Sequence, residues 1–62
     1  KSPAVDTALY GMADAFYSLH ACTDAKGALE ALGKRKPGKA LEDRVKQLER
    51  VIREAPKGYC TS

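Results

Sequence analysis

The sequence predicts an all-α protein, either a helical hairpin or a small three-helix bundle, held together by a disulfide. Two observations predict the helices: apolar residues repeat at alternating steps of four and three in two stretches, residues 3–22 and 39–55. A third observation predicts the disulfide, because a chain of only 62 residues carries two cysteines, Cys22 and Cys60.

The N-terminal stretch carries the first apolar stripe. Its members are Val5, Leu9, Met12, Phe16 and Leu19. Pro3 suits the first position of a helix, and Asp6 suits its first turns, near the positive end of the helix dipole. We therefore expect a helix from about residue 3 to about residue 22.

Beyond this stripe the apolar row rotates slightly and continues to Leu32, through Cys22, Ala25 and Leu29. Two interpretations fit this shift. One long helix covers residues 3–32, which gives a hairpin, or the helix breaks near Thr23 and a short second helix follows, which gives a three-helix bundle. Thr23 and Asp24 are both suitable N-caps for that second helix. Gly33 is expected to end it in the left-handed conformation.

Residues 39–55 form the clearest helix of the sequence. The apolar stripe consists of Leu41, Val45, Leu48, Ile52 and Ala55, and charged residues occupy the other faces. Pro37-Gly38 marks a turn before it, and Pro56 disfavours helical geometry at Ala55. A helix of this length is marginal alone in water, so its stripe needs a partner. We expect Leu48 and Ile52 at the centre of the core in either architecture.

The cysteine pair is expected to be bonded, because a chain this short builds a core that rarely contributes more than about 3–5 kcal/mol. Closing a loop of about 39 residues restricts the unfolded chain and stabilises the fold by roughly 4 kcal/mol. Disulfides persist in oxidising compartments, so we expect a secreted or periplasmic protein. The start Lys1-Ser2-Pro3, without an initiator methionine, is interpreted as that of a processed or excised product.

The net charge of +3 originates in one loop, residues 33–38, and the residue after it. The basic residues there are Lys34, Arg35, Lys36 and Lys39. One interpretation is a phosphate-binding patch for nucleic acid or anionic lipid. The segment has no interleaved aromatic residues and is no helix face, so we favour a solvated connector near the negative end of the preceding helix. Gly33-Lys34-Arg35 also resembles a dibasic processing signal, although the triplet is too short to be specific.

The sequence shows no pattern for catalysis, a cofactor or a metal. His20, Cys22 and Asp24 alternate, but helical residues two apart point to different sides and cannot share one ion. The chain has no CxxC or HxxxH spacing. It also has no run of about eighteen apolar residues, so we expect no membrane span. We therefore expect a protein that is not an enzyme, with His20 at the surface as a pH-sensitive contact.

These observations predict a helical protein–protein interaction module, such as an inhibitor, an immunity or exclusion protein, or an accessory subunit. In the hairpin, the long first helix outruns its partner and leaves apolar side chains uncovered. The candidate partner-binding residues are Val5, Leu9, Tyr10, Met12 and Tyr17. The expected partner is another protein or a second copy of the chain. Two alternatives stay open: a nucleic-acid-binding fragment that acts through residues 34–39, and a structural homodimer.

Overall fold

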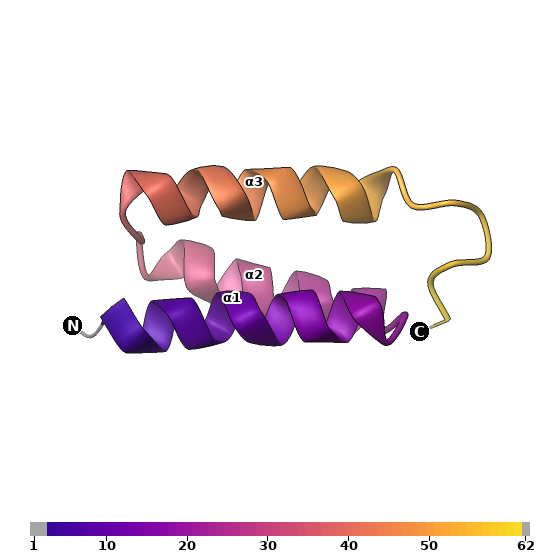
Figure 1. Ribbon diagram of the computed structural model, residues 1–62, viewed down its shortest axis with the longest axis horizontal. Coiled ribbons are helices and arrows are strands. Elements are labelled where there is room, and N and C mark those ends of the chain that lie inside the picture. Colours follow the sequence, from indigo (N-terminus) through magenta and orange to yellow (C-terminus); the bar gives the residue numbers. More distant parts are fainter. Residues whose placement is uncertain (1–2, 62) are drawn as a thin grey trace.

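Three α-helices make up the computed structural model of the chain, which describes residues 3–61. They are α1 (Pro3–Ser18), α2 (Cys22–Lys34) and α3 (Lys39–Arg53). Successive helices run in opposite directions along the long axis, and the tail after α3 returns to the end of α1 (Figure 1). The molecule measures 37 × 16 × 15 Å. Within the described residues there are helices and no strands, which confirms the all-α class.

The chain adopts the three-helix bundle, and the hairpin is wrong. Of the two open interpretations, the continuous helix over residues 3–32 is not formed: α1 ends at Ser18, before the expected end near residue 22, and α2 folds back along it. The last helix ends at Arg53, slightly before the expected end at Ala55. A disulfide joins Cys22 to Cys60, as the sequence predicts.

The break after α1 has a definite backbone geometry. His20 adopts a φ of 67°, in the left-handed region. The N–H of Ala21 donates to the carbonyl of Phe16 at 2.8 Å, and the N–H of His20 donates to the carbonyl of Tyr17 at 2.9 Å. These two bonds define a Schellman C-cap, in which the left-handed residue is usually glycine. A histidine at this position is no ordinary stop signal, so the apolar pattern alone does not reveal the break.

α2 begins earlier than expected, because the N-cap is Ala21 and neither Thr23 nor Asp24. The carbonyl of Ala21 accepts the first helical hydrogen bond, from the N–H of Ala25 at 3.0 Å. The chain has to turn sharply at His20, and the new helix starts as soon as that turn is complete. Thr23 and Asp24 therefore lie within the first turn of α2 and not at its N-cap.

The stop expected at Gly33 is also wrong. Gly33 lies inside α2, and the left-handed residue after the helix is Lys36, with a φ of 53°. The N–H of Lys36 donates to the carbonyl of Gly33 at 3.2 Å, which closes the last turn. Pro37 follows directly and prevents further helical hydrogen bonding. Gly38 is then the N-cap of α3.

The core lies between the three helices. Its buried residues are Ala13, Cys22, Ala25, Ala28, Leu29, Leu32, Val45, Leu48 and Ile52. α1 and α2 share the most extensive contact, and the fully buried Ala13 and Ala25, one on each helix, are small enough for the two backbones to approach closely. Leu48 and Ile52 are 6% and 4% exposed, which confirms their expected place in the core.

Candidate interaction surface

α1 carries apolar side chains on two different sides. Ala13 is completely buried, and four larger residues of the helix, Leu9, Tyr10, Phe16 and Tyr17, pack partly against the core. On another side, Val5 and Met12, together with Leu19 directly after the last residue of α1, are 43%, 49% and 72% exposed. Their spacing of seven residues is close to two helical turns, which aligns them in one row. The sequence reveals that spacing, but it does not show that this row faces outward.

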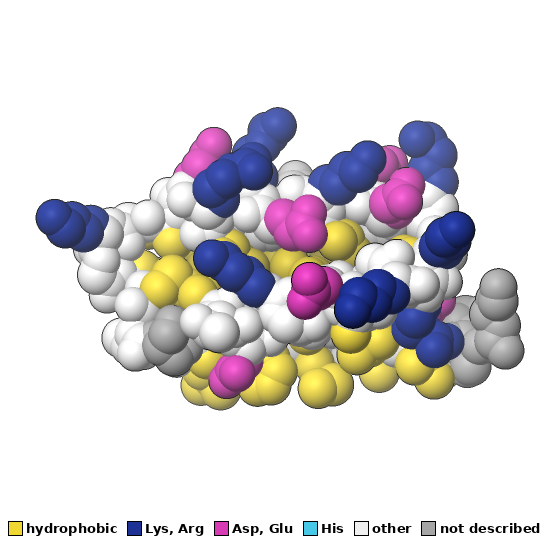
Figure 2. Space-filling model, turned by 180° about the vertical axis from the view of Figure 1, so that it is seen from behind, with side chains coloured by type: hydrophobic (Ala, Val, Ile, Leu, Met, Phe, Trp, Pro, Cys, Tyr) yellow, Lys and Arg dark blue, Asp and Glu magenta, His cyan; other side chains and the backbone are white. Residues whose placement is uncertain are grey.

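Small residues extend the row into a broad apolar surface. We call it the outer face of α1; it consists of Ala4, Val5, Ala8, Gly11, Met12, Ala15 and Leu19, all exposed. A Cβ atom at Gly11 would meet no other atom within 4 Å, so no other part of the described chain covers this position. Figure 2 shows apolar side chains along the lower edge of the molecule, where α1 lies, and charged side chains gathered over α3 at the top.

Charge is nearly absent from the outer face. α1 has no Lys or Arg, and its acidic residues are Asp6 and Asp14. Asp6 is partly buried and paired with Arg35, whereas Asp14 is exposed beside the outer face. More than half of the residues of α3 are charged. The exterior is therefore divided between one apolar side and one highly charged side.

The structure separates the expected partner-binding residues into two groups. Val5 and Met12 lie on the outer face, while Leu9, Tyr10 and Tyr17 are half-buried against the core. The overhang of a two-helix hairpin is not formed, because α2 and α3 both contact α1. Leu19 was missed as a candidate, since its place in the apolar stripe suggested burial.

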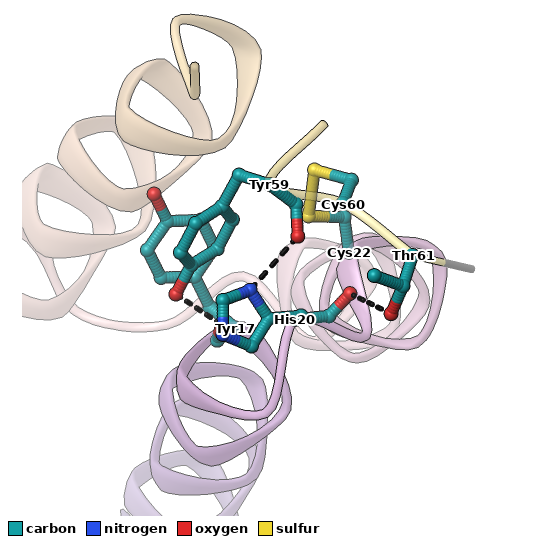
Figure 3. Close-up of a disulfide and its surroundings, with 6 residues drawn as sticks. All are labelled: Tyr17, His20, Cys22, Tyr59, Cys60 and Thr61. Carbon is teal, nitrogen blue, oxygen red and sulfur yellow. Dashed lines mark hydrogen bonds between the residues drawn. A yellow bond between two sulfur atoms is a disulfide. The ribbon is translucent and has the colours of Figure 1, made fainter. Parts of the chain in front are cut away.

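A second feature is the attachment of the C-terminal tail to the turn between α1 and α2. The Cys22–Cys60 disulfide has a sulfur–sulfur distance of 2.05 Å and joins Cα atoms 5.4 Å apart. Next to it, the Tyr59 hydroxyl donates to the carbonyl of Tyr17 at 2.8 Å. The Thr61 hydroxyl donates to the carbonyl of His20 at 3.3 Å (Figure 3). The backbone N–H of Thr61 donates to the same carbonyl at 3.0 Å.

The His20 side chain belongs to the same attachment. Its Nδ1 lies 2.8 Å from the carbonyl oxygen of Tyr59, and because a carbonyl only accepts, Nδ1 is the donor. The Tyr59 ring centroid lies 4.1 Å from that of His20 and 4.7 Å from that of Tyr17. His20 is exposed, as expected, but its ring and its backbone carbonyl are both engaged in holding the tail.

The basic loop is only partly available to a ligand. Nε of Arg35 donates to Oδ1 of Asp6, which ties the end of α2 to the first turns of α1. Lys34, Lys36 and Lys39 are exposed. The Arg35 contact favours the interpretation of this segment as a connector, and nucleic-acid binding stays a prediction.

An open groove lies between α2 and α3. It is lined by Thr23, Lys26, Gly27, Glu30, Glu49 and Arg53. Both signs of charge line it, so it selects no particular ligand chemistry. The described part of the chain contains no group of three or more His, Cys, Asp or Glu residues that could hold a metal ion. Within residues 3–61, no helix combines the length and the apolar character that a membrane span needs.

Comparison with known proteins found no match among family models, curated proteins or solved structures. Function is therefore proposed from the chemistry of the chain's own surface. The outer face of α1 is the part of the described exterior that departs most from the charged surroundings, and it is the strongest candidate for a binding surface.

Proposed function

We propose that the protein is a small protein–protein interaction module of an oxidising compartment, secreted or periplasmic, and that the outer face of α1 is its contact surface. The observation that carries the proposal is the exposed row of Val5 and Met12 on α1, a helix without basic residues, continued by the exposed Leu19 directly after its last residue. When a partner covers a contiguous apolar surface of this kind, the free energy of the system falls. An inhibitor, an immunity or exclusion protein, or an accessory subunit fits such a module.

The partner is a protein rather than a polyanion or an anionic membrane. The outer face carries no positive charge that would attract phosphate groups, and the neighbouring Asp14 carboxylate repels them. Met12 adds to this argument, because methionine is enriched at protein interfaces and its flexible side chain adapts to the shape of a partner.

The attachment of the tail by a disulfide supports the proposed compartment. The disulfide closes the loop between residues 22 and 60, and such bonds persist where thiols are not kept reduced. The core of this bundle is small, so the protein depends on the constraint that the bond places on the unfolded chain. A reducing compartment would remove that constraint.

Crosslinking in the native compartment tests the contact surface. We compare the wild type with Met12→Glu and with a matched control, Val51→Glu, because Val51 is 41% exposed and lies on α3. Glutamate has a helix propensity close to that of methionine, so both variants retain the fold. We expect the wild type and the Val51 variant to form the same crosslinked species, whether with another protein or with a second copy, and the Met12 variant to form none. Equal crosslinking by all three proteins would contradict the proposal.

A further inference from the structure

We infer that the connector between α2 and α3, residues 35–38, is a cleavage site for an endoprotease that recognises a pair of basic residues. The bond that is cut joins Arg35 to Lys36, and the product is two chains held together by the Cys22–Cys60 disulfide. This inference concerns a different part of the molecule from the outer face of α1 and is independent of the proposed function. Three features of the connector support it: its residues, its exposure, and its place inside the loop that the disulfide closes.

Adjacent basic residues occur at one place in this sequence, Lys34, Arg35 and Lys36. A protease pocket that ends in a carboxylate binds a guanidinium through two parallel hydrogen bonds, so Arg35 suits the position before the cut, and Lys34 suits the position before that. The next bond along the chain, between Lys36 and Pro37, is a poor substrate, because proline has no N–H and its ring is rigid. The residues of the connector therefore select the bond between Arg35 and Lys36.

The connector lies at one end of the bundle, and the attachment of the tail lies at the other (Figure 1). Lys34, Arg35 and Lys36 are all exposed, and the Arg35 side chain keeps 35% exposure while it contacts Asp6. An ion pair that is open to solvent on one side is weak and breaks readily, so it leaves Arg35 available to a protease. Exposed connectors of this kind are the preferred sites of proteolytic cleavage in folded proteins.

The end of α2 has to open before the cut, because a protease binds its substrate as an extended strand. Two backbone hydrogen bonds close this end, from the N–H of Arg35 to the carbonyl of Leu32 at 3.0 Å and from the N–H of Lys36 to that of Gly33 at 3.2 Å. Gly33 is exposed and lowers the stability of the last turn. Lys36 is in the left-handed conformation, so opening relieves backbone strain. The connector can therefore open while the rest of the bundle stays folded.

The cut falls between Cys22 and Cys60, inside the covalent loop that the disulfide closes. Water adds across the peptide bond, so Arg35 gains a carboxylate and Lys36 gains an ammonium group, and no other reactant is needed. One chain then carries α1 and α2, the other carries α3 and the tail, and the disulfide links them. Because the peptide bond and the disulfide belong to the same loop, breaking either one removes the same constraint on the unfolded protein. The cleaved protein should therefore unfold at about the same urea concentration as the uncleaved chain with both cysteines replaced by alanine.

Cleavage of the folded protein by a subtilisin-type endoprotease that cuts after Lys-Arg pairs tests the site, with a free peptide of residues 30–40 as the reference substrate. We expect one cut, after Arg35, at a rate within about tenfold of the peptide rate. The mass should rise by one water molecule before reduction, and two fragments, residues 1–35 and 36–62, should appear after it. Lys34→Gln should resist cleavage, whereas the matched control Lys39→Gln should be cut like the wild type. Glutamine has a helix propensity close to that of lysine, so both variants retain the fold.

Analysis of the protein recovered from the cells that make it, or from their medium, tests whether the cleavage takes place there. We expect wild-type protein that separates into two chains on reduction, and Lys34→Gln protein that remains one chain. Two outcomes would overturn the inference. Cleavage of the folded protein more than about a thousandfold more slowly than the peptide would show that the connector is cut only after global unfolding. Wild-type protein recovered as one chain after reduction would show that the site is not used.

Discussion

The hydroxyl of Tyr59 donates a hydrogen bond to the backbone carbonyl of Tyr17, a residue 42 positions earlier, at 2.8 Å. The two rings also face each other, with centroids 4.7 Å apart. Tyr59 precedes Cys60, so this contact and the disulfide act side by side at the end of α1. The last residues described are therefore part of the fold, although they form no helix.

Two substitutions of Tyr59 separate its hydroxyl from its ring. Tyr59→Phe removes one partly buried hydrogen bond and retains the ring contacts, so we expect a loss of about 0.5–1.5 kcal/mol in the free energy of unfolding. Tyr59→Ala also removes the contacts with Tyr17 and His20 and should cost more. Urea unfolding measures both values. Stabilities equal to that of the wild type would show that the disulfide alone holds the tail.

His20 combines an unfavourable backbone conformation with favourable side-chain contacts. His20→Ala should destabilise the protein, because it loses the Nδ1 hydrogen bond and the ring contact but keeps a side chain in the left-handed conformation. His20→Gly loses the same contacts and removes the backbone strain, so it should be more stable than the alanine variant by about 1 kcal/mol. Thermal unfolding of the pair measures this difference. The opposite order of stability would contradict the left-handed turn.

The disulfide has a direct chemical test. The mass of the unreduced protein should be lower than that of the dithiol form by two hydrogen atoms, and alkylation without reductant should leave both cysteines unmodified. Replacing Cys22 and Cys60 by alanine should reduce stability by roughly 4 kcal/mol. For a domain this small, that loss is a large part of the total stability. Complete alkylation of the native protein would contradict both the bond and the oxidising compartment.

A pair of substitutions on α3 tests the position of the core. Leu48 is 6% exposed, so Leu48→Ala should cost about 2–5 kcal/mol, from lost burial and from the cavity that it leaves. Val51 is on the same helix but 41% exposed, and Val51→Ala should change stability by less than about 0.5 kcal/mol. Similar melting temperatures for the two variants would mean that α3 is not packed as described.

The basic loop requires a separate measurement. If the exposed lysines bind polyanions, the wild type should be retained on heparin at low salt, and replacing Lys34 and Lys36 by serine should abolish that retention. We expect little difference between the two proteins, because Arg35 is engaged with Asp6 and only lysines remain for contact. Strong retention that depends on both lysines would favour the alternative in which the protein binds nucleic acid.

Sequence reasoning alone predicts the helical class, α3 with its buried Leu48 and Ile52, and the disulfide. These features depend on local physics: a repeat of about 3.6 residues places apolar groups on one side of a helix, and a small domain needs a crosslink. The candidate surface could be predicted only in part, since Val5 and Met12 lie on the outer face but Leu9, Tyr10 and Tyr17 do not.

Tertiary contacts decided where the first helix ends and which side of α1 is buried. The turn at His20 becomes favourable only when the tail is in place to bind its ring and its carbonyl, and that tail lies about forty residues away in the sequence. α1 is apolar on most of its circumference, so hydrophobicity alone does not select one side. The close approach of α2 requires a small residue at the contact, which is why Ala13 is buried while Val5, Met12 and Leu19 remain exposed.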